Sequence, residues 1–502
     1  MYQVLLITPE QKSGLCKQLF MKIQNVPMNN VCFNINDTKN QFFDAVICDI
    51  ACHNSIQQYS NNIKEDATFY LFISQSIIKM EDNSFLSELE KECYNAKDWK
   101  KLKKINAFKI ELNHIRKKTL LDTFSKFLQI ECTNVCNARC IMCNHFYDYG
   151  RQNLHINNEF IDKIDKILPY IEVMSLHGQG EPFLCKDISK YLSYFSKYDI
   201  KFQANTNLSV ITNELLELVN TSFVSLNISC DGCTKEVYEE IRRNLSFEKF
   251  CQNLKRVVES CPTLKKSLYV VAMRQNLMQI PEFVDFAAKY KITEIIFTNL
   301  GVSPIIMNDN DSLINYPGIA KEQFQMAKKK GENLGIEVSY PNIFDNMTGD
   351  IVQETKKYNK NDIPLSSIRE AQILKKYNEL LKTHPIALVP LSVYGEESNV
   401  ACRGICEWLI ECCYIDLHGY VHPCCIKQGY FITNIYEYTD FLSLWNSKIY
   451  QSIRNMYYNN KMPLFCEGCH FIQNHFMRRL NVDETNLTQT IIDKCIILEN
   501  NR

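Results

Sequence analysis

The stretch Cys136-Asn-Ala-Arg-Cys140-Ile-Met-Cys143 places three cysteines on one short loop, with the spacing C-x3-C-x2-C. Coincidence is a weak explanation for this spacing, although the chain contains 23 cysteines in 502 residues. A structural zinc site requires four protein ligands, whereas three thiolates leave one position open. On a cluster of four irons, three thiolates leave one iron free to bind a further ligand, as a catalytic cluster requires. The loop therefore predicts a catalytic iron–sulfur site, and zinc is the alternative.

A strand–helix alternation begins directly before this loop and continues to about residue 300. Apolar strands are predicted at residues 127–130, 173–176, 200–204, 223–228, 268–272 and 294–297. Amphipathic helices lie between them, and one apolar face consists of Phe247, Phe250, Leu254, Val257 and Val258. This alternation predicts a parallel sheet, in which functional groups gather at the C-terminal strand ends. The fold class is α/β, a partial (β/α)6 TIM-like barrel.

Three further regions flank this core, which we place at residues 121–310. Residues 1–120 are interpreted as a small α/β domain that ends in a basic stretch, Lys97 to Lys104, expected to form a solvated linker helix. Residues 311–400 are expected to be mixed helix and loop, with one helix from about Ser366 to Lys382. Residues 401–502 are dense in Cys, Gly, His and aromatic residues, which is typical of a fold organised around a metal.

The composition argues against several classes of partner. Lys and Arg number 56 against 57 Asp and Glu, so the formal net charge of -1 provides no field to attract nucleic acid. The first residues show no basic leader or cleavage site, and no apolar run is long enough to cross a membrane. We therefore expect a cytoplasmic protein, in whose reducing surroundings thiols are free, buried or metal-bound.

Four more segments follow successive predicted strands. They are Gly178-Gln-Gly180-Glu181-Pro182, Asn205-Thr206-Asn207, Ser229-Cys-Asp231-Gly232 with the later Tyr238-Glu-Glu-Ile-Arg-Arg243, and Met273-Arg-Gln-Asn276. Together with the three-cysteine loop, they resemble the motifs of the radical S-adenosylmethionine (SAM) superfamily. One departure is Leu208, which stands where the family's Thr-Asn-Gly motif has glycine.

This resemblance implies a SAM-binding 4Fe–4S cluster on Cys136, Cys140 and Cys143. It also assigns contacts to SAM to Gly178, Gly180, Glu181, Asn207, Ser229, Arg242 and Asn276. The glycines would let the backbone approach the ligand, and the carboxylate of Glu181 would hold the methionine ammonium. By the same resemblance Ser229 would reach the ribose, Arg242 or Arg243 the SAM carboxylate, and Asn276 the adenosyl group. The barrel is thus expected to be a radical SAM barrel.

A second set of cysteines lies near the C-terminus. Cys406 is followed after twelve residues by Gly419, after four more by Cys424, and later by Cys466-Glu-Gly-Cys469. This order resembles the SPASM or twitch domain, which binds auxiliary iron–sulfur clusters. A full SPASM domain would continue with a further C-x5-C pair, but His475 occupies that position. We therefore expect one auxiliary 4Fe–4S cluster on Cys406, Cys424, Cys466 and Cys469, with a four-cysteine zinc site as the alternative.

The resemblance implies reductive cleavage of SAM to a 5'-deoxyadenosyl radical that abstracts a substrate hydrogen, with electrons from a flavodoxin- or ferredoxin-type donor. We favour dehydrogenation or epimerisation of a small molecule or sugar, because residues 1–120 do not resemble the winged-helix module with which peptide maturases bind leader peptides. A peptide- or protein-modifying maturase is the alternative, and a non-catalytic electron-transfer protein is a third hypothesis. For an epimerase, a thiol such as Cys402, Cys412 or Cys413 would be the candidate hydrogen donor. The sequence identifies no general base.

Overall fold

The computed structural model describes residues 84–143, 153–300, 311–346, 348–358, 404–425 and 430–466, together with isolated strands outside these ranges. A ten-stranded sheet forms the centre, in the order β14-β13-β12-β10-β9-β8-β6-β18-β19-β21. Its strands are β6 (Phe127–Ile130), β8 (Val173–Leu176), β9 (Lys201–Thr206), β10 (Phe223–Ser229), β12 (Lys265–Ala272), β13 (Glu294–Asn299), β14 (Glu337–Ser339), β18 (Cys412–Ile415), β19 (Tyr420–His422) and β21 (Thr433–Asn434). All strands predicted for the barrel are present, and each pairs with its neighbour in parallel.

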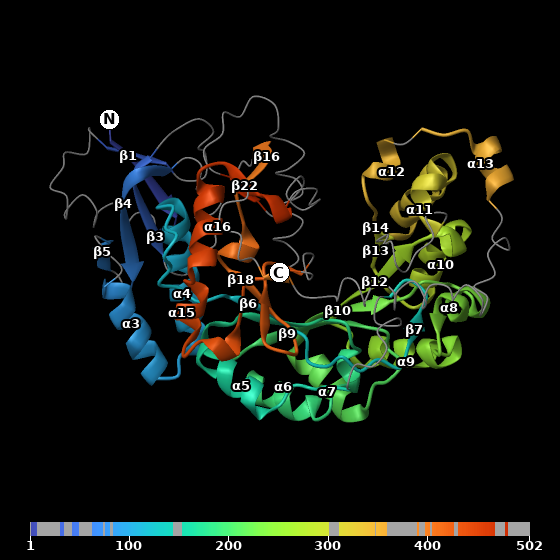
Figure 1. Cartoon of the computed structure of the whole chain (residues 1–502), viewed down its shortest axis with the longest axis horizontal. Helices are drawn as coiled ribbons and strands as arrows, with labels where there is room; N and C mark the ends of the chain where they lie inside the picture. The colour runs from blue at the N-terminus through green and yellow to red at the C-terminus, as the bar shows by residue number, and fades with distance from the viewer. Residues whose placement is uncertain are drawn as a thin grey trace.

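Helices cover one face of this sheet (Figure 1). They are α5 (Asn158–Ile164), α6 (Ile188–Ser196), α7 (Asn213–Ser222), α8 (Lys235–Ile241), α9 (Phe247–Ser260) and α10 (Glu282–Lys289). Several begin at a polar side chain that accepts from the first turn, such as Asn157 before α5, Thr212 before α7 and Ser246 before α9. The α/β core of parallel strands and covering helices that the sequence predicts is confirmed.

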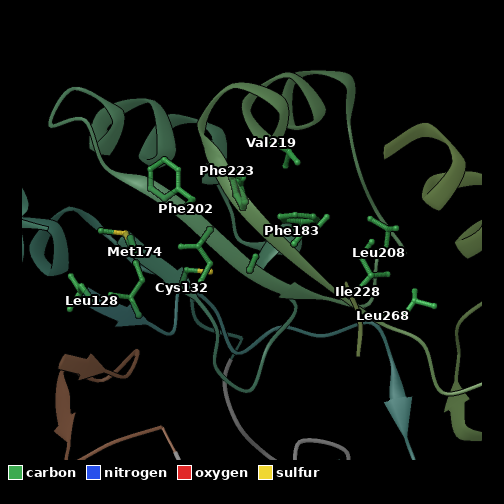
Figure 2. Close-up of a cluster of buried hydrophobic side chains, with 14 of the residues drawn as sticks. Leu128, Cys132, Met174, Phe183, Phe202, Leu208, Val219, Phe223, Ile228 and Leu268 are labelled. Carbon is green, nitrogen blue, oxygen red and sulfur yellow. The ribbon is translucent and has the colours of Figure 1, made fainter. Parts of the chain in front are cut away.

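The core lies between the sheet and these helices (Figure 2). Leu128, Met174, Phe202 and Ile228 extend from consecutive strands, and all four side chains are inaccessible to solvent. Val219 on α7 belongs to the same cluster. Because side chains alternate along a strand, the residues between these apolar ones lie on the opposite face of the sheet.

The first residues form a separate five-stranded sheet. Its strands are β1 (Tyr2–Ile7), β2 (Val31–Asn34), β3 (Phe43–Asp49), β4 (Ile63–Ile73) and β5 (Ser76–Met80), in the order β2-β1-β3-β4-β5. All pairs are parallel except β4 with β5. The small α/β domain at residues 1–120 stays a prediction.

Two helices connect this sheet to the barrel, α3 (Ser84–Asn95) and α4 (Trp99–Ile115). The solvated linker helix expected at Lys97 to Lys104 is found only in part: Lys97 and Lys100 are exposed, but Lys103 and all residues from Ile105 to Ile115 of α4 are buried. The ammonium of Lys103 donates to the carbonyls of Tyr198 and Asp199, each at 2.7 Å, and Lys109 pairs with Glu90 at 2.8 Å. The carbonyls thus replace water around the Lys103 ammonium, and the Glu90 carboxylate does so for Lys109.

The region that follows the barrel contains α11 (Pro317–Leu334), α12 (Ile343–Asn346) and α13 (Ile351–Lys357). The helix predicted near Ser366 to Lys382 lies outside the described residues. Of the helices in the part of the chain that the structure describes, none is long and apolar enough to cross a membrane.

The C-terminal region extends the barrel sheet. Strand β18 pairs in parallel with β6, from Cys412 opposite Phe127 to Ile415 opposite Ile130. Helices α15 (Phe441–Trp445) and α16 (Lys448–Tyr458) follow. On α16 the buried Arg454 donates to the carbonyls of Leu409 and Thr119. It therefore connects this region to the segment that precedes β6.

Candidate functional site

The three-cysteine loop is held in place by a segment about 100 residues later in the chain. Directly after β6, the short strand β7 (Arg139–Cys140) pairs antiparallel with β11 (Arg242–Arg243). The N–H of Ile141 donates to the carbonyl of Ile241 at 3.0 Å, and the N–H of Cys143 donates to Cys140 at 3.1 Å. The Tyr238-to-Arg243 motif and the cysteine loop, far apart in sequence, therefore form one unit.

The cysteine sulfurs meet polar donors. Asn207 Nδ2 lies 3.8 Å from the sulfur of Cys136, and Arg242 Nη1 lies 3.9 Å from that of Cys140. Burial raises the pKa of the Cys136 thiol to about 11 and that of Cys140 to about 12. Only bound metal would make these buried thiols thiolates at neutral pH, and the two donors would then stabilise the sulfurs. The loop thus fits an iron–sulfur cluster.

The cysteines do not have the arrangement of a single-ion site. Among the described residues, no three His, Cys, Asp or Glu side chains are placed so that they could hold one metal ion. Ligands of a 4Fe–4S cluster bind different irons and are therefore spaced more widely than the ligands of one zinc ion.

Glu181 is buried between the ends of two strands. Its carboxylate accepts from the Thr206 hydroxyl and from the Asn207 N–H, both at 2.6 Å, and from the Phe183 N–H at 3.3 Å. Burial raises its pKa to about 7, although these hydrogen bonds and Arg242 act in the opposite direction. A carboxylate has about four acceptor positions, so one remains for an ammonium group.

The motif glycines are required by the protein's own packing. A Cβ on Gly178 would lie 2.5 Å from Cγ of Glu131, and one on Gly180 would overlap the carbonyl oxygen of Thr133. Because neither glycine has a side chain, the loop before Glu181 packs closely against Glu131 and Thr133, which precede the cysteine loop. We expected them to admit the ligand; the structure shows close contact with the chain itself.

Asn207 and Leu208 form the turn after β9. Besides approaching Cys136, the side chain of Asn207 donates to Asn137 Oδ1 at 3.2 Å. Leu208 has φ +53°, in the left-handed region where the family has glycine. Leucine thus occupies a left-handed position that glycine adopts at lower energetic cost.

Two other residues predicted to contact SAM, Arg242 and Asn276, bind Asp231. The sequence predicted no role for Asp231. Arg242 pairs with the buried Asp231 carboxylate at 2.7 Å. The Asn276 amide donates to the carbonyls of Asp231 and Val271 and accepts from the Met273 N–H, so it ties strand ends together. Ser229 is the last residue of β10, half-buried. Asp231 belongs to the segment Ser229-Cys-Asp231-Gly232, so the sequence could have indicated it, but its pairing with Arg242 is visible only in the fold.

Three of the four C-terminal cysteines lie close together. Cys406 ends β17 (Gly404–Cys406), Cys424 follows β19, and Cys466 ends the short helix η12 (Leu464–Cys466). Burial raises the pKa of Cys406, and the nearby Cys424 and Cys466 add to this effect. Gly419 has φ +82° in the turn between β18 and β19, and a Cβ there would collide with Tyr436.

The remaining cysteines divide as follows. Cys469 and Cys402 lie outside the described residues. Cys412 and Cys413 are buried in β18. The three described cysteines of the predicted auxiliary site, Cys406, Cys424 and Cys466, therefore lie near one another, as a cluster site requires.

Comparison with known families agrees with this geometry. Residues 130–287 match the radical SAM superfamily, and residues 406–470 match the SPASM iron-sulfur cluster-binding domain. The chain therefore contains a radical SAM domain and, toward its C-terminus, an SPASM iron-sulfur cluster-binding domain. Such domains carry a SAM-binding 4Fe–4S cluster and an auxiliary iron–sulfur cluster, which confirms the expected cofactors.

Among individual relatives, the chain is similar to mycofactocin maturase MftC of Mycobacterium tuberculosis. The two are 29% identical over 168 residues, which are 32% of this chain and 42% of that relative, so the match spans less than half of the maturase. A probable GTP 3',8-cyclase of Methanocaldococcus jannaschii is 24% identical over 232 residues, 44% of this chain and 76% of that relative. Among solved structures, SuiB of Streptococcus suis bound to S-adenosylmethionine has a TM-score of 0.47 at 16% identity, covering 74% of this chain and 79% of that one.

Proposed function

We propose that this protein is a radical SAM enzyme that abstracts a hydrogen atom from a polypeptide. The observation that carries the proposal is the unit formed by β7 and β11, in which Asn207 and Arg242 lie against the sulfurs of Cys136 and Cys140. Asn207 also donates its backbone N–H to the buried carboxylate of Glu181, which is suited to bind an ammonium group. The site can therefore bind SAM as well as carry an electron-transfer cluster. A non-catalytic electron-transfer protein would not need that carboxylate.

Each residue of the site has a defined task in this proposal. Cys136, Cys140 and Cys143 hold the first cluster, and Glu181 fixes the methionine ammonium. When bound and reduced, that cluster supplies the electron that splits SAM into methionine and a 5'-deoxyadenosyl radical. The buried Arg242 and Asp231 exclude water from the cluster loop and balance charge beside it. Gly178, Gly180, Asn207, Ser229 and Asn276 shape the remaining SAM contacts.

The C-terminal thiols complete the enzyme. We assign one auxiliary 4Fe–4S cluster to Cys406, Cys424, Cys466 and Cys469. Bound there, it would supply an electron acceptor close to the barrel, since β18 is paired with the first barrel strand. A flavodoxin- or ferredoxin-type protein would deliver the electrons.

The substrate assignment departs from the preference that the sequence suggested. A small molecule or sugar was favoured there, but the relatives include proteins named mycofactocin maturase, which supports the polypeptide alternative. Residues 1–120 differ from a winged-helix module and do not oppose this, because a leader-binding element need not have that fold. Small-molecule chemistry is the second candidate, favoured by the relative named as a probable GTP 3',8-cyclase.

The test is metal content together with SAM turnover. Anaerobically reconstituted protein should hold about eight irons per chain, as two 4Fe–4S clusters, and should cleave SAM slowly to 5'-deoxyadenosine when reduced. Replacement of Cys136, Cys140 and Cys143 by alanine should leave about half of the iron and abolish cleavage. Zinc in place of the remaining iron would reject the auxiliary cluster, and cleavage by the triple variant would reject the first site.

A further inference from the structure

Three side chains form a row across the helix-free face of the barrel sheet. His177 follows β8, Asn205 lies in β9 and Asn227 in β10. Their strand neighbours Leu176, Ala204 and Ile228 are buried in the core, so the three lie on the opposite face. The register pairs Leu176 with Ala204 and Asn227 with Asn205, which places all three in one line across the sheet.

This row lies next to the predicted SAM contacts. Asn227 is two residues before Ser229 on the same face of β10, and Asn205 is two residues before Asn207, which directly follows β9. Two residues of a strand span about 7 Å. A group held by the row would thus lie one side-chain layer below SAM, within reach of a radical formed there.

The two asparagines leave one amide NH₂ group and one amide oxygen without a partner in the part of the chain that the structure describes. Asn227 Nδ2 donates to Asn205 Oδ1 at 2.8 Å, and the structure records no other partner for either amide among the described residues. The NH₂ group of Asn205 and the oxygen of Asn227 therefore remain available. If nitrogen and oxygen were exchanged in both amides, the two asparagines would swap roles, but one NH₂ group and one oxygen would still have no partner. The pair is half-buried, so these positions are not fully hydrated.

The row carries no charge of its own. His177 is held neutral at neutral pH, because burial lowers the pKa of its imidazole. Beyond it in the same line, the Glu131 carboxylate already accepts from the Gln179 N–H at 2.7 Å. At the other end, Glu294 accepts from the Ser267 hydroxyl and pairs with Lys265 at 3.2 Å. Anionic groups such as phosphate or carboxylate would thus find no unpaired cation here.

We infer that His177, Asn205 and Asn227 bind an uncharged amide group of the substrate, a peptide bond or a side-chain carboxamide. An amide carries one C=O and one N–H, which matches the unused donor and acceptor of the asparagine pair. This inference rests on the proposed function and makes it more specific: the row selects a polypeptide substrate and places an amide beside the carbon from which hydrogen is taken. Asn205 and Asn227 are binding residues in this scheme, and His177 supplies a neutral donor or acceptor beside them.

The experiment uses the full chain, reconstituted anaerobically and loaded with SAM, with N-acetylglycine N-methylamide as the probe in saturation-transfer NMR. We expect saturable binding of this diamide, and weaker binding of acetate and methyl glucoside. Asn205→Leu with Asn227→Leu should weaken diamide binding about tenfold or more, because the amide loses both partners. Gln203→Leu, on the same face but one row farther from Asn207, is the control and should change binding less than about twofold.

Several results would overturn the inference. They are no diamide binding to the wild type, equal binding by the double variant, or binding of methyl glucoside as tight as that of the diamide. If the double variant does not fold, Asn227→Leu alone should weaken binding in the same direction, and no change there rejects the inference. SAM cleavage by the wild type is measured separately: cleavage without diamide binding rejects the amide row alone, whereas no cleavage rejects the proposed function.

Discussion

At the scale of single residues, Glu181 combines burial with a specific charge requirement. Its carboxylate is protonated more readily than an exposed one, because burial raises its pKa to about 7. Holding an ammonium group requires the ionised form. Binding of SAM should therefore displace a proton from Glu181, which makes the affinity for SAM depend on pH.

The affinity of the wild type for SAM should rise as the pH increases from about 5.5 to 7.5, because Glu181 ionises in this range. Glu181→Gln should remove this dependence and weaken binding by about 1.5 to 3 kcal/mol, the cost of losing a charge-assisted hydrogen bond. Isothermal titration calorimetry at several pH values measures both effects. Glu354→Gln is the control, since Glu354 is also buried but accepts from the first turn of α11. Unchanged affinity in Glu181→Gln would remove this residue from the site.

Leu208 gives an unusual order of stabilities. Its left-handed backbone costs about 1 to 2 kcal/mol for a residue with a Cβ, and its side chain is fully buried. Leu208→Ala loses the buried side chain and keeps the strain, whereas Leu208→Gly loses the side chain and relieves the strain. We expect the glycine variant to be the more stable by about 1 kcal/mol, the reverse of the usual order. Denaturant unfolding of the anaerobic proteins measures this difference, and alanine more stable than glycine would contradict the backbone assignment.

At the scale of elements, the strands were predictable and their side-chain partners were not. Each barrel strand shows an apolar run, and the motifs follow strand ends, so local pattern was sufficient. The stretch from Lys97 to Lys104 was interpreted as a solvated helix because it is basic; only the packed structure supplies the carbonyls that accept from the buried Lys103. The pairing of β7 with β11 and the row of His177, Asn205 and Asn227 depend on register between distant strands, which no local pattern encodes.

The ion pair behind the β7–β11 ladder should be important for stability. Asp231→Asn leaves Arg242 as a buried charge without its partner, which typically costs about 3 to 5 kcal/mol. Asp231→Leu combined with Arg242→Met should destabilise less than Asp231→Asn alone, because no unpaired charge remains. The exposed pair Lys255–Glu259 is the control, and Glu259→Gln should change the free energy of unfolding by less than about 1 kcal/mol. Equal losses in the single and double variants would show that the pair contributes packing alone.

At the scale of the whole molecule, one sheet joins both cluster regions. The cysteine loop follows β6, and β18, which is paired with β6, lies between Cys406 and Cys424 in sequence. The C-terminal region therefore continues the barrel sheet through β18, which pairs with the strand that leads to the cysteine loop. This arrangement allows the two clusters to have separate ligands and a fixed relative position, so that loss of one need not remove the other.

Replacing Cys466 and Cys469 by alanine should therefore separate the two roles. The variant should retain about half of the iron and still form 5'-deoxyadenosine, because the first cluster and the SAM contacts lie in the barrel. Oxidised product should be lost, since a substrate radical would then lack its electron acceptor. Cys251→Ala is the matched control: this half-buried cysteine lies on α9, outside both cysteine groups, and the variant should keep its full iron content. Iron content, 5'-deoxyadenosine and product mass are measured on the same samples. Loss of SAM cleavage together with the auxiliary iron would show that the two cluster regions fold as one unit, and zinc in place of that iron would reject the auxiliary cluster.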